Sequence, residues 1–144
     1  MKTKSLMLAV IGLLVAAPLH AADFIVVNTD FSGYTFNGGP LNATITLTRG
    51  TTYTFDVSTP GHPFWIKTAQ VTGTGSAFGT GVTNNGIQSG TLTFAVPAMG
   101  SSPGAPDTLF YACQFHGNMT GTIMITNPIA VEQRTWSSVK ALDH

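Results

Sequence analysis

The sequence predicts an all-β protein, an antiparallel Greek-key β-sandwich made of two packed sheets. Short stretches in which apolar and polar residues alternate recur along the chain, and this period of two is typical of half-buried strands. Clusters of Gly, Pro and Asn separate these stretches, and no long helical pattern or internal repeat interrupts them. Roughly 120 residues after a leader suffice for one such domain and not for two.

The two ends of the chain are expected to lie outside this domain. Residues 1–22 combine Lys2 and Lys4, an apolar run over 6–17 and a small-residue end, which predicts a cleaved signal peptide and a periplasmic or secreted protein. The sandwich is expected over residues 23–127. Residues 128–144 are expected to form a C-terminal tail, either a short helix or a flexible segment. No later segment is apolar enough to predict a membrane span.

The strands can be placed in order from the alternating pattern. Residues 43–47 and 53–57 flank Arg49-Gly50, which predicts a hairpin between them. Residues 70–90 are rich in Gly, Thr, Ser and Asn and are expected to form a long surface excursion, with a hairpin at 84–86. The remaining expected strands lie at 24–27, 34–36, 64–66, 92–96, 108–113 and 121–125.

The segment from Thr108 to Thr126 contains the only cysteine of the chain. Cys113 is followed after two residues by His116, and after two more by Met119. A thiolate, an imidazole and a thioether in one short turn are ligands that copper takes in a trigonal site with a weak axial sulfur. The segments before and after this turn have strand periodicity. The sequence therefore predicts a metal site in a tight loop that joins two strands, and we expect one copper ion.

Each of these residues also has a plain structural interpretation. A single Cys can be a small buried hydrophobe, although an exported thiol is open to oxidation and its neighbours favour metal ligation. His62 lies in a bend between Pro60 and Pro63, where a histidine with no special role is common. If the turn at Cys113 holds copper in a site with two His and one Cys, His62 is the only plausible second imidazole, because His144 is the terminal residue.

An early His in a bend, a strand that ends Tyr-x-Cys, and Cys-x2-His-x2-Met followed by Gly-x-Ile together resemble the cupredoxins, the small blue copper proteins. The spacing in the ligand loop looks most like that of amicyanin. The resemblance implies that His62 and His116 are imidazole ligands through Nδ1, Cys113 the thiolate ligand and Met119 the axial thioether. It also implies that His116 lies near the surface. There, Gly117, Met99 and Phe115 would form a small apolar surround for electron exit.

Two residues depart from the pattern of this family. Pro63 follows the first histidine, where relatives have a residue whose backbone N–H supports the Cys sulfur, and proline has no N–H to donate. Phe115 lies two residues after Cys113, where amicyanin-like loops often have proline, and it has a free N–H. We therefore expect the N–H of Phe115 to be the one backbone donor to the thiolate.

The expected function is that of an exported one-electron carrier, a monomer that exchanges electrons with redox protein partners. The alternatives are a copper-binding or copper-delivery protein and a secreted binding module without an electron-transfer role. Four basic and six acidic side chains follow residue 22, and a net charge of −2 gives no field that would attract nucleic acid. We expect no catalytic residues, because the sequence has no second histidine cluster and no recognisable triad motif.

Overall fold

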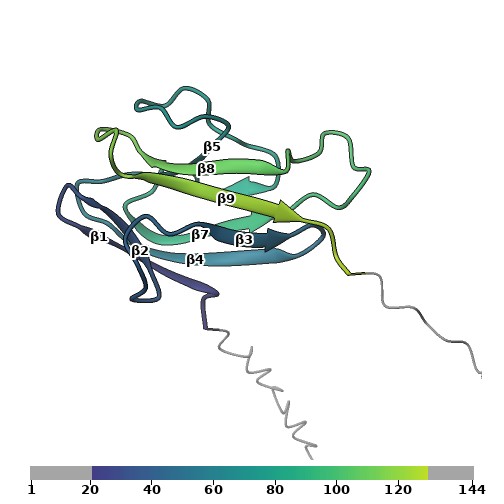
Figure 1. Ribbon diagram of the computed structural model, residues 1–144, viewed down its shortest axis with the longest axis horizontal. Helices are drawn as coiled ribbons and strands as arrows, with labels where there is room; N and C mark the ends of the chain where they lie inside the picture. The colour runs from purple at the N-terminus through teal and green to yellow at the C-terminus, as the bar shows by residue number, and fades with distance from the viewer. Residues whose placement is uncertain (1–20, 130–144) are drawn as a thin grey trace, which may run out of the picture.

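The computed structural model describes residues 21–129. The predicted signal peptide therefore falls almost wholly outside the described residues, as does the predicted tail from residue 130 onward. The described part is all-β and forms two sheets that pack face to face, which confirms the predicted sandwich (Figure 1). Between residues 21 and 129 no helix is long and apolar enough to cross a membrane.

Nine strands make up the described part. One sheet has the strand order β2-β1-β4-β7-β6, and the other has the order β3-β9-β8-β5. The bounds are β1 Phe24–Thr29, β2 Gly33–Phe36, β3 Ile45–Thr48, β4 Thr52–Ser58, β5 Phe64–Lys67, β6 Val82–Thr83, β7 Ser89–Ala95, β8 Thr108–Cys113 and β9 Thr120–Thr126.

Both sheets are mixed and not purely antiparallel as predicted. Strand β1 pairs with β4 in parallel, and β3 pairs with β9 in parallel. The predicted hairpin around Arg49-Gly50 is wrong, because β3 and β4 belong to different sheets. The backbone N–H of Arg49 bonds to Thr126 O and that of Gly50 to Val96 O, so this corner leads the chain from one sheet to the other. Alternation shows that one face of each strand is buried, but not which strand it pairs with.

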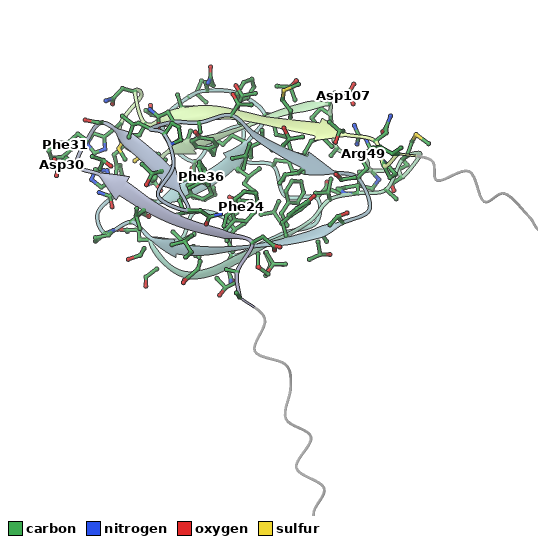
Figure 2. All side chains as sticks on the ribbon, turned by 60° about the horizontal axis from the view of Figure 1, so that its bottom comes forward. Phe24, Asp30, Phe31, Phe36, Arg49 and Asp107 are labelled. Carbon is green, nitrogen blue, oxygen red and sulfur yellow. The ribbon has the colours of Figure 1, made fainter. Side chains whose placement is uncertain are left out.

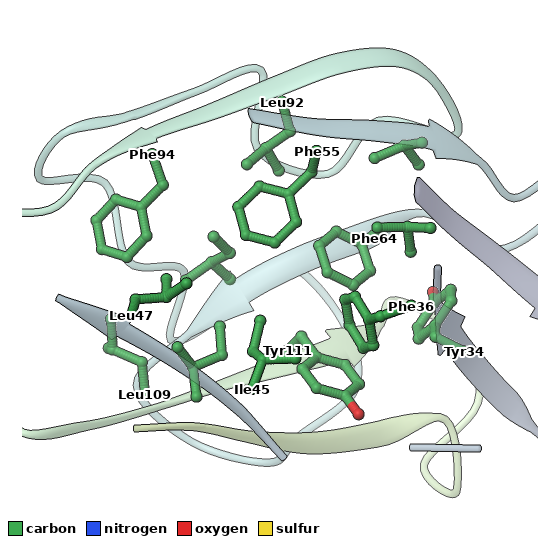
Figure 3. Close-up of a cluster of buried hydrophobic side chains, with 14 of the residues drawn as sticks. Tyr34, Phe36, Ile45, Leu47, Phe55, Phe64, Leu92, Phe94, Leu109 and Tyr111 are labelled. Atoms are coloured by element: carbon green, nitrogen blue, oxygen red, sulfur yellow. The ribbon is translucent and has the colours of Figure 1, made fainter. Parts of the chain in front are cut away.

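The core lies between the two sheets and is filled by the alternating apolar residues of each strand. Phe55, Leu92 and Phe94 point inward from one sheet, and Leu109 and Tyr111 face them from the other (Figure 3). Tyr111 and Phe64 stack with their ring centroids 5.7 Å apart. Cys113 and Met119 belong to the same buried cluster. The sheets therefore provide a packed support directly beneath the predicted metal site.

The excursion between β5 and β7 covers the free edge of β5. The N–H of Phe64 bonds to Ile87 O, and that of Phe78 bonds to Ile66 O. The Asn85 side chain accepts from the Ile66 N–H and donates to Ile66 O and Phe78 O. β6 and β7 pair antiparallel, as a hairpin here requires, but Thr83 pairs with Thr93, so the connection runs over residues 84–92 and is not the tight turn predicted at 84–86. Covering an edge strand in this way removes a template for unwanted pairing.

Three connections meet at one end of the sandwich. The β1–β2 turn contains Phe31, and the β4–β5 bend contains His62. The third is the β8–β9 loop, which follows Cys113 and contains His116. Figure 2 shows Asp30 and Phe31 at this end, and Arg49 and Asp107 at the opposite end. The parallel pairing of β1 with β4 brings the first two connections to the same end, because both strands run toward it.

Candidate metal centre

Local backbone hydrogen bonds shape the two segments that carry the predicted ligands. His62 lies in the β4–β5 bend, where its N–H bonds to Thr59 O at 2.9 Å. In the β8–β9 loop the Met119 N–H bonds to His116 O at 3.2 Å, and the Cys113 N–H bonds to Met119 O at 2.9 Å. These bonds close the loop from Cys113 to Met119 on itself. Strand pairing of Phe64 with Cys113 then brings the bend beside the loop.

The structure brings His62, Cys113 and His116 together. The two Nδ1 atoms lie 3.1 Å apart, and Cys113 Sγ lies 3.8 Å from His62 Nδ1 and 3.6 Å from His116 Nδ1. In a triangle with these sides, the point equidistant from all three atoms lies about 2.0 Å from each. That distance equals metal–nitrogen distances of roughly 2.0–2.1 Å in zinc sites and approaches the metal–sulfur distance of roughly 2.3 Å. The three donor atoms are therefore spaced to share one metal ion.

The four predicted ligands differ in burial, and one histidine is nearer the surface than the other three residues. Cys113 and Met119 have no exposed surface, and His62 is 7% exposed, whereas His116 is only partly buried. Burial lowers the pKa of His62, and the charge of His116 lowers it further, while Asp30 acts in the opposite direction. A lower pKa keeps the imidazole of His62 neutral, with a lone pair free for a metal.

The donor set distinguishes between metals. Among residues 21–129 no carboxylate and no further His or Cys joins the cluster. A structural zinc site would need a fourth nitrogen, oxygen or thiolate ligand. Two imidazoles and one thiolate, with a thioether as a weak fourth donor, are instead typical of blue copper sites. The buried side chain of Met119, in the same loop, offers that thioether.

The sulfur of Cys113 receives the backbone hydrogen bond that the sequence predicted. The N–H of Phe115 donates to Cys113 Sγ at 3.4 Å, which confirms the expectation for this residue. Pro63, which follows His62 in the chain, has no N–H to add. Its carbonyl group and that of His62 instead accept from the hydroxyl group of Tyr34, at 3.1 and 3.0 Å. The Tyr34 ring thus fixes the backbone on which His62 is mounted.

Sequence reasoning assigned Tyr34 only to a strand and gave it no part in the site. The side chain has no exposed surface and packs edge-on against Phe64. Burial raises the pKa of Tyr34 above its usual range, and a hydrogen bond with Cys113 and the charge of that residue raise it further. The phenol is therefore neutral and keeps its proton for donation. Its alternation with Phe36 predicted burial, but nothing local indicated that it would reach the β4–β5 bend.

Phe31 is the second residue that sequence reasoning missed. Its ring centroid lies 5.6 Å from that of His62 and 5.2 Å from that of His116, while 65% of the side chain is exposed. Asn118 in the ligand loop donates to Phe31 O at 2.6 Å and so ties the loop to the β1–β2 turn. An exposed aromatic residue inside a turn was the available signal. Phe31, with Phe115, gives the edge of the site an apolar rim.

Met99 does not lie beside His116 as predicted. It lines a pocket of about 310 Å³ together with Arg49 and Asp107, at the opposite end of the sandwich from Phe31 (Figure 2). Met99 precedes β8 in the sequence, and β8 runs from that far end toward Cys113. Position in the chain could not show which end of the sheet each loop would reach. Phe31 takes the place that Met99 was expected to occupy.

Together the fold and the cluster define a β-sandwich whose His-Cys-His arrangement fits a type 1, or blue, copper site. Solved structures similar to this chain include rusticyanin from Thiobacillus ferrooxidans, at 18% identity, with 72% of this chain and 75% of that chain covered and a TM-score of 0.46. They also include a multi-copper oxidase from Pediococcus acidilactici, at 15% identity, with 88% of this chain and 32% of that chain covered and a TM-score of 0.37. No protein-family model and no curated protein matches the chain.

Proposed function

We propose that this protein is an exported type 1 copper protein that carries one electron at a time between redox proteins. One copper ion, cycling between Cu(I) and Cu(II), would be held by His62, Cys113 and His116, with Met119 as the axial ligand. The observation that carries this proposal is the triangle of three donor atoms whose centre lies about 2.0 Å from each. The spacing Cys-x2-His-x2-Met supports the narrower proposal of an amicyanin-like ligand loop.

Rigidity of the protein around the donors favours electron transfer over metal delivery. When bound, copper supplies a one-electron couple between a cuprous state that favours sulfur and a cupric state that favours nitrogen. The bend at His62 is held by Thr59 O and by the Tyr34 hydroxyl group, and the ligand loop is closed by its own backbone bonds. Ligands that cannot move toward either preferred geometry keep the structural change between the two states small. A delivery site would instead need ligands that open readily.

Electrons would enter and leave at the apolar end of the molecule. His116 is the most exposed of the four proposed ligands, while Cys113 and Met119 are fully buried. The imidazole of His116 lies beside Phe31, and Phe115 is 57% exposed nearby in the same loop. An apolar rim excludes water when two proteins meet and brings the imidazole edge close to the partner. Both imidazoles of the cluster are used as proposed copper ligands, so we propose a carrier and not an enzyme.

The experiment is a titration of the exported chain, without residues 1–22, with Cu(II). We expect one equivalent to bind and to give an intense blue colour, because the thiolate of Cys113 transfers charge to Cu(II). Voltammetry should show a reversible one-electron couple. The matched control is Cys113→Ser, which keeps the shape of the side chain but removes the thiolate and should be colourless. A colourless cupric wild-type protein, or a blue protein without a reversible couple, would contradict the proposal.

A further inference from the structure

Lys67 is a fully buried lysine at the end of β5. Its Nζ atom donates to Val71 O at 2.8 Å and to Gly73 O at 2.5 Å. The ion pair of Arg49 with Asp107 lies elsewhere, and within residues 21–129 the contacts of the Lys67 ammonium are these two carbonyl groups and no carboxylate. A lysine ammonium has only donors, and both of its contacts are carbonyl oxygens, which fits the charged form. Burying a charge without an opposite charge beside it lowers the stability of the folded state, so Lys67 is an unusual residue for this position.

The segment that Lys67 holds is in turn bonded to the ligand loop. The N–H of Gly73 donates to Gln114 O at 2.7 Å, while Lys67 binds the carbonyl oxygen of the same glycine. Gln114 lies between Cys113, the proposed thiolate ligand, and Phe115, whose N–H donates to the sulfur. Lys67 therefore reaches the surroundings of the thiolate through two successive hydrogen bonds. Through this connection, the start of the 70–90 excursion supports the ligand loop.

A buried cation in this place acts on the site electrostatically as well. Charge interactions are stronger in the protein interior than in water, because the effective dielectric constant is lower. Gly73 alone separates the Lys67 ammonium from Gln114, the neighbour of Cys113, so the charge lies near the thiolate. Burial lowers the pKa of Lys67, and the charge of Cys113 acts in the opposite direction. A fixed positive charge favours the state of the site with less positive charge, which is the reduced state.

We propose that Lys67 is a positioning residue of the copper site: it holds the segment Val71–Gly73 against the ligand loop and, as a buried cation, favours the cuprous state. This inference rests on the proposed function, because it concerns the potential of the same site. The hydrogen bonds from Lys67 to Val71 and Gly73, and from Gly73 to Gln114, carry it. Lys67 itself does not bind the metal.

The first arm of the experiment tests the connection in copper-free protein. In Lys67→Met the apolar stem is kept, but both hydrogen bonds and the charge are lost. We expect hydrogen exchange of the Gly73 amide to become at least about tenfold faster, because the segment that carries it is no longer held. Wild-type protection of this amide in Lys67→Met would overturn the proposal. This arm requires no copper, so its result stands even if the protein proves not to be a blue copper protein.

The second arm measures the reduction potential of copper-loaded variants. Lys67→Met and Lys67→Gln both lose the charge, whereas the Gln side chain keeps amide donors for the carbonyl oxygens. We expect both to shift the equilibrium toward Cu(II) by up to about tenfold, which is about 59 mV for a one-electron couple. The control is Thr46→Asp, at an exposed position of β3, which changes the net charge by the same amount. Its potential should stay close to that of the wild type.

The outcomes separate the two proposals. If the wild type is blue but Lys67→Gln has the same potential as Thr46→Asp, the inference about Lys67 is wrong and the proposed function stands. If the wild type binds copper without colour, the proposed function fails whatever the variants do. Should Lys67→Met fail to fold, Lys67→Gln still tests the charge, because the Gln side chain fills the site and can bond to the same carbonyl oxygens.

Electron paramagnetic resonance of the copper-loaded variants is a further control. A spectrum like that of the wild type shows that the ligands have not moved.

Discussion

At the scale of single residues, the surroundings of the Cys113 sulfur are the most distinctive feature. The backbone N–H of Phe115 donates to the sulfur, whereas Pro63, beside His62, has no N–H to donate. The Tyr34 hydroxyl group holds the carbonyl groups of His62 and Pro63 instead. Hydrogen bonds around the sulfur set the reduction potential of such sites. The potential of this protein should therefore depend on Phe115.

We predict that Phe115→Pro lowers the potential. The substitution removes the N–H, so electron density on the thiolate rises and the cupric state is favoured. Hydrogen bonds to charged groups contribute roughly 1.5–3 kcal/mol, and only the difference between the two oxidation states, a fraction of this, appears in the potential. Voltammetry of the folded blue protein measures the shift. Phe115→Ala is the control, because it removes the exposed ring but keeps the N–H.

Equal potentials for the Pro and Ala variants would mean that this hydrogen bond does not influence the site. A lower potential in the Pro variant alone would assign the effect to the N–H and not to the ring. The Phe115 nitrogen lies 3.4 Å from the sulfur, an ordinary length for a hydrogen bond to an atom as large as sulfur, so the N–H is placed to act on the thiolate.

At the scale of elements, β5 depends on the excursion that follows it. β5 pairs with β8 on one side only, and its other edge is covered by backbone bonds and by the side chain of Asn85. Asn85 satisfies the N–H and the carbonyl group of Ile66, as well as the carbonyl group of Phe78. β5 begins directly after the His62 bend, so the edge cover also stabilises one wall of the site.

We predict that Asn85→Ala lowers the free energy of unfolding by about 2–3 kcal/mol, because the N–H of Ile66 and the carbonyl group of Phe78 lose their partner and water replaces it only in part. The carbonyl group of Ile66 keeps the N–H of Phe78 as a partner. Chemical denaturation of the copper-free protein measures this value. Thr83→Ala, at an exposed position of β6, is the control and should change stability by less than about 0.5 kcal/mol. A loss for Asn85→Ala no larger than that of the control would show that the excursion does not stabilise the β5 edge.

At the scale of the whole molecule, the packed core reaches the metal cluster, because Cys113 and Met119 belong to both. The aromatic and aliphatic residues between the sheets pack without any contribution from the ligand nitrogens (Figure 3). The ligand loop is closed by protein hydrogen bonds alone. We therefore expect the site to exist before the metal arrives, in contrast to small zinc domains that fold only with metal.

We predict that the copper-free protein is folded, with the far-ultraviolet circular dichroism of the loaded form, and that copper raises its melting temperature. A ligand at 1,000 times its dissociation constant stabilises by about 4.1 kcal/mol. Cys113→Ser should keep the fold of the copper-free protein and lose most of this stabilisation. If the copper-free wild type is unfolded under the same conditions, the donor triangle is not preformed, and the argument from ligand rigidity fails.

Much of the site could be predicted from sequence because its chemistry is local. Cys113, His116 and Met119 lie within seven residues, and the strand pattern on either side shows that a turn joins them. The resemblance to the cupredoxins indicated two positions from which a backbone N–H could reach the sulfur, and covalent structure left Phe115, because Pro63 has no N–H. Residue type and spacing determine such features before any long-range contact forms.

The pairing of the strands, and the set of distant residues that reach the site, were decided by the tertiary structure alone. Alternation in 43–47 and 53–57 predicted two strands correctly but paired them with each other, whereas each pairs in parallel with a strand far away in the sequence. Phe31, Tyr34 and Lys67 reach the site from β1–β2 and β5, through contacts that no local pattern records. Periodicity shows which face of a strand is buried, whereas the partner, the sheet and the end of the sandwich depend on how the two sheets pack together.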